Sequence, residues 1–221
     1  MRAGIAAVLF DLDGTLIDSA PDLAGAANTL RAEHGLDAMP YEPLRAMVGS
    51  GARGMISVAF GIGPGHEQFE ALKDAFLDRY ESRLLAKTRV FDAMAPVLHA
   101  LDRAGRPWGI VTNKAMRFAA PVIAGLGLHQ RAAVVIAGDT TAQRKPHPEP
   151  LLEAARRMRI QASDCVYIGD DPRDIQAGRS AGMATLAAAW GYLGESQNID
   201  EWGADHVLAQ PDELLQWLEL A

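Results

Sequence analysis

Two carboxylates follow an apolar segment near the start of the chain. Residues 5–10 are continuously apolar, as is typical of a buried parallel strand, and Asp11 and Asp13 come directly after them. Ligands bind in open α/β sheets just beyond the carboxyl ends of the strands. Two carboxylates this close repel each other unless a cation, a shared proton or a cationic side chain balances them. Their hard oxygen atoms suit Mg²⁺, so the pair predicts a magnesium site at this position.

Three further groups of polar residues occur later in the chain. They are, in order, Thr112-Asn113-Lys114, Lys145 before a proline-containing turn, and Asp170-Asp171-Pro172-Arg173-Asp174. The carboxyl ends of parallel strands meet at one edge of a sheet, so we expect these groups to converge on the first two carboxylates. Such a set suits attack on a phosphomonoester. One carboxylate acts as nucleophile and another as acid and base, while an ammonium and a hydroxyl hold the phosphoryl oxygens.

The elements that position these groups alternate between strands and helices. Strand-like segments lie at residues 6–10, 108–112, 133–137, 165–168 and 184–189. Helical patterns separate most of them. One begins after Pro148 and aligns Leu151, Leu152, Ala155 and Met158 on its inner face. The alternation predicts an α/β fold with a doubly wound parallel sheet and right-handed crossovers.

The stretch from residue 17 to about residue 87 breaks this alternation, because it contains no convincing strand. Leu23, Ala27 and Leu30 align on one helix, and a second helix aligns Phe69, Leu72, Phe76 and Tyr80. A helical insert directly after the first strand would lie over the acidic loop, which is the position of a lid. We therefore predict a core of residues 1–15 and 87–221 and a helical cap of residues 16–86.

Composition limits the classes of partner. The net charge of −7 and the lack of a Lys/Arg block argue against nucleic acid, but they allow an anionic metabolite in a local cationic pocket. The single cysteine, Cys165, excludes an internal disulfide and lies in an apolar segment, where an inert thiol is expected. With no membrane-length apolar stretch and no signal-peptide layout, we expect a cytoplasmic protein without a membrane partner, as a monomer or homodimer.

In this order, the four polar groups resemble the motifs of the haloacid dehalogenase-like (HAD) hydrolase superfamily, and the resemblance extends over the whole chain. It implies a Rossmann-like core with an inserted helical cap. It also implies that Asp11 is the nucleophile and Asp13 the general acid/base. By the same resemblance Thr112, Asn113 and Lys145 bind the phosphoryl group.

The resemblance also implies the metal site. Asp11, the backbone carbonyl of Asp13, and Asp170 would bind Mg²⁺, with Asp174 supporting them. One departure is Asp171, which stands where many relatives have serine or another small polar residue. It either adds negative charge near the metal or caps the helix that Pro172 opens.

Two groups within the superfamily are similar to different parts of the chain. Residues 18–23 and 48–52 resemble phosphoglycolate phosphatases. Other segments resemble the N-acetylmuramic acid 6-phosphate phosphatases of peptidoglycan recycling, namely residues 69–72, 108–114, 117–118, 169–175 and 202–205. The first group predicts a phosphoglycolate phosphatase-like enzyme, and the second is the alternative. Arg53, in a glycine-rich cap segment, either binds the carboxylate that both substrates carry or is a solvated helix-start arginine.

Other activities stay open at this stage. A β-phosphoglucomutase-like phosphomutase would return the phosphoryl group to its substrate rather than to water. A haloacid dehalogenase is disfavoured, because Asp13 would have no leaving oxygen to protonate. A phospho-receiver signalling domain combines similar residues, but it would have no use for a helical insert after the first strand.

Overall fold

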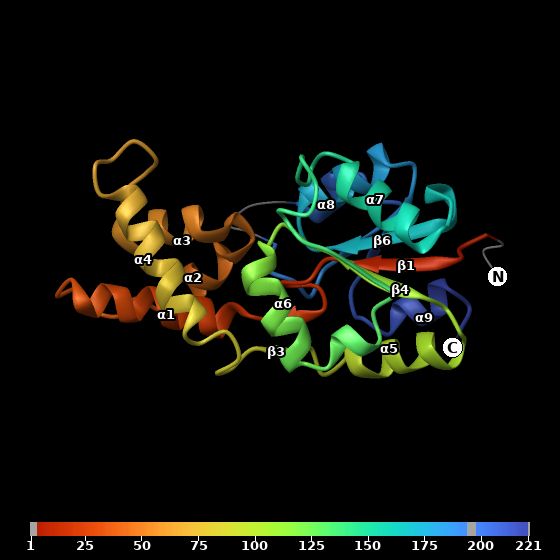
Figure 1. The fold of residues 1–221 in the computed structure, drawn as a ribbon, viewed down its shortest axis with the longest axis horizontal. Helices are drawn as coiled ribbons and strands as arrows, with labels where there is room; N and C mark the ends of the chain where they lie inside the picture. The colour runs from red at the N-terminus through yellow and green to blue at the C-terminus, as the bar shows by residue number, and fades with distance from the viewer. Residues whose placement is uncertain (1–3, 194–197, 221) are drawn as a thin grey trace.

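The core of the computed structural model is a six-stranded parallel sheet with the strand order β5-β4-β1-β6-β7-β8 (Figure 1). The structure describes residues 4–193 and 198–220. The strands are β1 Ala7–Phe10, β4 Trp108–Val111, β5 Val134–Ile136, β6 Cys165–Gly169, β7 Ala184–Ala188 and β8 His206–Leu208. Central β1 pairs with β4 on one side and with β6 on the other. The polar groups that follow these three strands therefore begin side by side.

Helices cover both faces of the sheet, which explains why β1 is apolar throughout. Val8 and Phe10 belong to one hydrophobic cluster and Ala7 and Leu9 to the other, and all four are fully buried. The first face carries α5 Met94–Arg103, α6 Met116–Gly125 and α9 Glu213–Trp217. The second carries α7 Glu149–Met158 and α8 Pro172–Ser180. The predicted doubly wound α/β core is confirmed.

A helical cap lies beyond the carboxyl ends of the strands, on the left in Figure 1. It consists of α1 Ala20–Glu33, α2 Tyr41–Ala46, α3 Gly51–Phe60 and α4 Phe69–Glu81, with a short 3₁₀ helix, η1 Val48–Ser50. The predicted inner residues of α1 and α4 are buried. They belong to the same hydrophobic cluster as the first face of the sheet, so apolar contact between cap and core is continuous.

Two chain segments connect cap and core, and they are joined to each other. Strand β2, Ile17–Asp18, pairs antiparallel with β3, Arg89–Val90. Next to this pair, one carboxylate oxygen of the buried Asp22 accepts hydrogen bonds from the backbone N–H groups of Lys87 and Thr88, at 2.8 and 2.7 Å, and from the Thr88 hydroxyl. Both connections are therefore held by local bonds, close to the proposed boundaries at residues 16 and 86.

Two expectations about the elements were wrong, and one strand of the sheet was missed. Segment 17–87 does contain a strand, β2, and the edge strand β8 was not predicted. Both are short, and neither has a long enough apolar pattern to be recognised. Leu152 is 44% exposed, because the buried positions of α7 are Pro150, Leu151, Ala154 and Ala155. Leu152 lies about 100° around the helix from Leu151 and so faces solvent.

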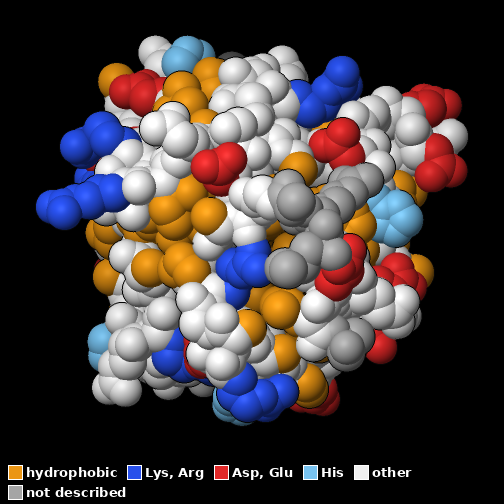
Figure 2. Space-filling view, turned by 90° about the vertical axis from the view of Figure 1, so that its right-hand side faces the viewer, with side chains coloured by type: hydrophobic (Ala, Val, Ile, Leu, Met, Phe, Trp, Pro, Cys, Tyr) orange, Lys and Arg blue, Asp and Glu red, His pale blue; other side chains and the backbone are white. Residues whose placement is uncertain are grey.

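The end of the molecule away from the cap carries mixed side chains. In Figure 2, which shows this face, hydrophobic side chains group left of the centre, and Lys, Arg and acidic side chains are spread around them. Among the described residues, no helix is both long and apolar enough to cross a membrane.

The burial of Cys165 leads to a first prediction. Burial raises the pKa of its thiol to about 11, so at pH 8 only about one thiol in a thousand is the reactive thiolate. In the unfolded chain the pKa falls to about 8.5 and the thiolate fraction rises steeply. We expect the native protein to react with a chromogenic disulfide reagent at less than about 1% of the rate of the urea-unfolded protein.

The chain has one cysteine, so the unfolded protein supplies the control by releasing one equivalent of chromophore. The native rate should rise as the pH approaches 11. Equal rates for native and unfolded protein at pH 8 would contradict the burial of the thiol.

Candidate active site

Three carboxylates from two neighbouring strand ends meet at the edge of the sheet that faces the cap. Asp11 follows β1, Asp170 follows β6, and Asp174 lies in the first turn of α8. One oxygen atom from each lies within 4.8 Å of the others. Asp170 and Asp174 are 4% and 1% exposed. This all-oxygen set suits a hard divalent cation, which would also relieve the repulsion among the carboxylates.

The carboxylate of Asp170 is held from two sides. The Thr15 hydroxyl donates to one of its oxygens at 2.9 Å, and the backbone N–H of Tyr192 donates to the other at 2.8 Å. Two glycines let the backbone approach it. A Cβ atom on Gly14, whose φ is +87°, would lie 2.2 Å from an Asp170 oxygen, and one on Gly191 would lie 2.1 Å from its Cβ. The turn after β1 is thus built around this carboxylate.

Lys145 supplies the cation at the centre of the cluster. Its Nζ lies 2.8 Å from Asp11 Oδ1 and 2.7 Å from Asp174 Oδ1. It also donates to the Val111 carbonyl at 3.0 Å and to the Tyr167 hydroxyl at 2.8 Å. With 4% of the residue exposed, the ammonium is surrounded by these acceptors. It therefore has a fixed position beside the carboxylate expected to be the nucleophile.

Asn113 has a structural contact that was not expected. Its Nδ2 donates to the Lys145 carbonyl and its Oδ1 accepts from the Lys145 N–H, both at 3.0 Å. The side-chain amide thereby fixes the backbone of Lys145. Its role as a phosphate ligand stays a prediction. Thr112, at the end of β4, is 3% exposed, and its hydroxyl accepts from the backbone N–H of Lys114 at 3.1 Å.

The electrostatics follow from burial and crowding. Burial raises the pKa of Asp11 to about 7, with Lys145 acting against this shift and Asp174 adding to it. The pKa values of Asp170 and Asp174 are also raised, mainly by burial. Burial by itself would lower the pKa of Lys145, but Asp11 and Asp174 outweigh it and raise that pKa. The site is short of positive charge, as expected where a cation belongs.

The Asp13 side chain contacts a separate set of residues. Its carboxylate accepts hydrogen bonds from the Lys114 ammonium, at 3.0 and 3.1 Å, and from the Ser19 hydroxyl. It is not part of the carboxylate cluster of Asp11, Asp170 and Asp174. The two carboxylates of the first motif are thus placed for different tasks, and only the backbone carbonyl of Asp13 was expected at the metal.

Asp171 caps α8. Its side chain accepts from the Arg173 N–H at 2.9 Å, and its own N–H donates to Asp174 Oδ2 at 3.2 Å, which completes a capping box. It also forms an ion pair with the Arg173 guanidinium at 2.7 Å, and Arg173 in turn donates to the Gly49 carbonyl in the cap. The capping alternative is therefore the one that the geometry supports.

A cleft of 680 Å³ lies between cap and core above these residues. Arg53, from the first turn of α3, lines it together with Asp11 and Asp13. Its other basic lining residues are Lys73, Lys114, Arg117, Arg144, Lys145 and Arg173. This cationic rim suits an anionic ligand, as the sequence predicts for a phosphorylated metabolite.

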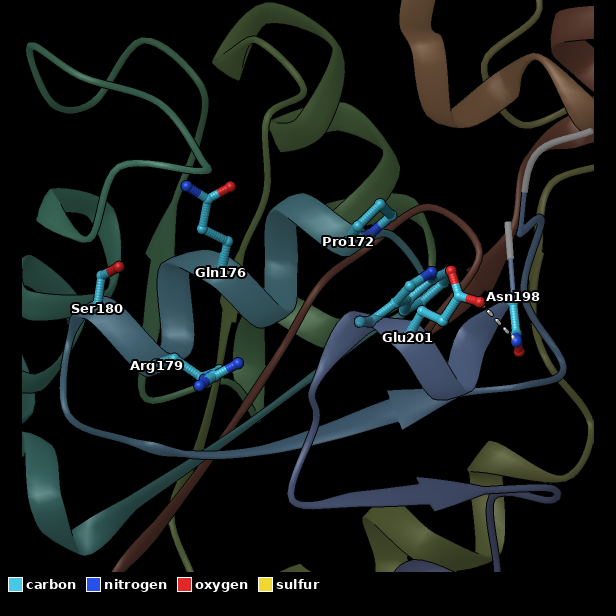
Figure 3. A pocket seen from close by; sticks show the side chains of 7 residues that line it. Pro172, Gln176, Arg179, Ser180, Asn198 and Glu201 are labelled. Carbon is cyan, nitrogen blue, oxygen red and sulfur yellow. Dashed lines mark hydrogen bonds between the residues drawn. The ribbon is translucent and has the colours of Figure 1, made fainter. Parts of the chain in front are cut away.

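A second hollow, of 760 Å³, flanks α8 and is shown in Figure 3. Gln176, Arg179 and Ser180 line it along the helix, and Asn198 donates to Glu201 at 3.1 Å on the opposite wall. The carboxylate cluster is not among its lining residues. The cleft under the cap is therefore the candidate active site.

Sequence reasoning did not single out Tyr167 or Tyr192 as site residues. Tyr167 bonds Lys145, and Tyr192 holds Asp170 through its backbone. A tyrosine inside the otherwise aliphatic strand β6 was the one available signal. Nothing in the sequence marks Tyr192, whose role depends on a backbone N–H.

Relatives with two different enzyme names are similar to this sequence. A phosphoglycolate phosphatase of Xanthomonas campestris pv. campestris is 48% identical over 209 residues, which cover 94% of each chain. An N-acetylmuramic acid 6-phosphate phosphatase of Pseudomonas aeruginosa is 41% identical over 220 residues, covering 100% of this chain and 97% of the relative.

Solved structures share the fold. A predicted phosphoglycolate phosphatase from Haemophilus somnus superposes with a TM-score of 0.86 at 24% identity, covering 99% of this chain and 100% of that one. CbbY from Rhodobacter sphaeroides, in complex with phosphate, superposes with a TM-score of 0.74 at 22% identity, covering 95% and 96%. The sequence profile of the Haloacid dehalogenase-like hydrolase family matches residues 8–188. With its carboxylates, its lysine and its cap in these positions, the chain belongs to the haloacid dehalogenase-like hydrolases.

Proposed function

We propose that this protein is a magnesium-dependent phosphatase that hydrolyses a small phosphomonoester through an aspartyl-phosphate intermediate on Asp11. The observation that carries the proposal is the position of Lys145, whose ammonium contacts both Asp11 and Asp174 beneath a cationic cleft. A lysine there neutralises the nucleophile and offers hydrogen bonds to phosphoryl oxygens. The relatives named as phosphatases support the same reaction.

The residues suit two successive transfers. A carboxylate oxygen of Asp11 attacks phosphorus, the bond from phosphorus to the leaving oxygen breaks, and Asp13 gives that oxygen a proton. Asp13 then takes a proton from water, whose oxygen attacks phosphorus. The bond to Asp11 breaks, and inorganic phosphate leaves. Lys145 and Thr112 hold the phosphoryl oxygens during both steps.

The carboxylate cluster would hold the metal. The oxygen ligands come from Asp11, Asp170 and Asp174. Hard oxygen ligands of this kind favour Mg²⁺. Bound there, Mg²⁺ would neutralise phosphate charge and so let the anionic nucleophile approach. A cytoplasmic location and a monomeric or homodimeric state, expected from the sequence, remain proposals.

We propose 2-phosphoglycolate as the substrate, because the phosphoglycolate phosphatase relative has the higher identity of the two, 48%. N-acetylmuramic acid 6-phosphate is the second candidate. It is favoured by the relative that matches 100% of this chain and by the 680 Å³ of the cleft, which leaves room for a sugar acid. Both substrates carry a carboxylate that Arg53, on the cleft wall, would bind.

Replacing the nucleophile tests the mechanism. Asp11→Asn keeps the size of the side chain but removes the nucleophilic charge, so we expect kcat to fall by about a thousandfold or more with the fold intact. Phosphate release and the thermal unfolding midpoint would be measured on the same preparations. Asp37→Asn, at an exposed site, is the matched control. Retained turnover in Asp11→Asn would exclude this residue as the nucleophile.

Metal removal tests the cluster. Exhaustive chelation should abolish phosphate release, and added Mg²⁺ should restore it. Independently of activity, Mg²⁺ at a hundredfold excess over its Kd should raise Tm by roughly 5 °C, because it binds only the folded state. Asp170→Asn should remove most of that shift. Full activity after chelation, or an equal Tm shift in Asp170→Asn, would show that the metal is not held here.

The substrate is tested by comparing kcat/KM for 2-phosphoglycolate and N-acetylmuramic acid 6-phosphate, and we expect the first to be preferred. Preference for the second would move the enzyme to cell-wall recycling without changing its mechanism. For whichever substrate is preferred, Arg53→Met should raise KM by about tenfold, because the carboxylate loses its charged partner.

An aryl phosphate without a carboxylate is the internal control for Arg53, and its KM should change by less than about twofold. Arg103→Met, at an exposed position on α5, is the matched variant. Equal changes in KM for both kinds of substrate would show that Arg53 does not recognise the carboxylate.

A further inference from the structure

Lys114 lies between the expected acid/base residue and the cap. Its side chain is only 8% exposed, and its Nζ lies 3.0 and 3.1 Å from the two carboxylate oxygens of Asp13. On the cap side, the same Nζ lies 4.6 Å from the ring centroid of Tyr80, on α4. One ammonium therefore contacts the catalytic loop of the core and an aromatic face of the cap.

The Tyr80 ring is itself firmly placed. It is 2% exposed, stacks on Phe76 of α4 at 6.5 Å, and contacts Phe118 of α6 in the core at 5.7 Å. The Lys114 ammonium lies over the face of this ring. A cation over an aromatic ring is attracted most strongly where water is excluded, as it is here.

Burial should make this lysine costly, and its neighbours offset the cost. Burial by itself lowers the pKa of Lys114, but Asp13 and Tyr80 together outweigh it and raise that pKa, so the side chain stays charged. A buried charge that lost either neighbour would move toward water. The position of the ammonium consequently depends on both contacts.

We propose that Lys114 is a positioning residue that aligns the carboxylate of Asp13, and that Tyr80 makes this alignment depend on the cap lying over the core. The inference rests on the proposed phosphatase function. Lys145 holds the nucleophile from within the core, whereas Lys114 holds the acid/base residue only where core and cap meet. Proton transfer is thus supported when the cleft is covered and weakened when α4 moves away.

The test uses p-nitrophenyl phosphate, whose leaving group departs without much help from an acid. Phosphorylation of Asp11 then stays fast, while hydrolysis of the aspartyl-phosphate still needs Asp13 as a base. In Lys114→Met we expect kcat to fall by about tenfold or more, with a burst of about one p-nitrophenolate per enzyme. KM should not rise, and Lys114→Arg should recover part of kcat. Lys87→Met, at an exposed lysine, is the matched control.

The cap contact has its own variant. Tyr80→Leu keeps apolar bulk but removes the ring, so it should give the same burst and lowered kcat. The double variant with Lys114→Met should be no slower than Lys114→Met alone, within about twofold, because both changes break one arrangement. Tm values would show whether each variant is folded. If Lys114→Met does not fold, the same measurements on Tyr80→Leu and Lys114→Arg test the proposal.

Three outcomes would overturn the proposal. A higher KM with unchanged kcat and no burst in Lys114→Met would make Lys114 a substrate contact. Multiplying losses in the double variant would make Lys114 and Tyr80 independent. Normal turnover in Tyr80→Leu would show that the alignment of Asp13 does not depend on the cap. By contrast, a wild-type protein that releases phosphate from neither p-nitrophenyl phosphate, 2-phosphoglycolate nor N-acetylmuramic acid 6-phosphate would refute the phosphatase function itself.

Discussion

The crowding of buried carboxylates at the end of β1 is the constraint on which the structure depends. Asp11, Asp170 and Asp174 lie within reach of one another, and burial raises the pKa of each. Such a cluster is stable only with positive charge beside it. The fold supplies one charge permanently, through Lys145 in contact with Asp11 and Asp174. The remaining imbalance is what suits the site to a cation and, under the proposed function, to a phosphate.

Several residues outside the carboxylate cluster hold it in place. The side-chain amide of Asn113 fixes the backbone of Lys145, and the Tyr167 hydroxyl accepts a hydrogen bond from its ammonium. Gly14 gives the turn after β1 room to pack on Asp170. In the structure these residues hold the position of the cluster and of Lys145. Preorganised charges of this kind cost no rearrangement at the moment of reaction.

Much of this was predictable from the sequence, because parallel strands bring their ends to one edge. The continuous apolar run before Asp11 indicates a strand buried on both faces, and β1 is one. The contact between Asn113 and Lys145 was not predictable, because it joins a side chain to the backbone of a residue 32 positions away. Strands β2 and β8 were not predicted for another reason. They are only two and three residues long, and their pairing depends on neighbouring segments.

The placement of the cap has a mechanical consequence. Both of its connections to the core run through the β2–β3 pair, and Asp22 ties the second connection to the start of α1. The cap is therefore joined to the core at a single narrow junction, directly after the loop that carries Asp13. Besides the continuous apolar contact, charged side chains also join the two parts: Arg173 donates to the Gly49 carbonyl, and the Lys114 ammonium lies over the Tyr80 ring. A rotation of the cap at this junction would therefore change the contacts of these two charged side chains.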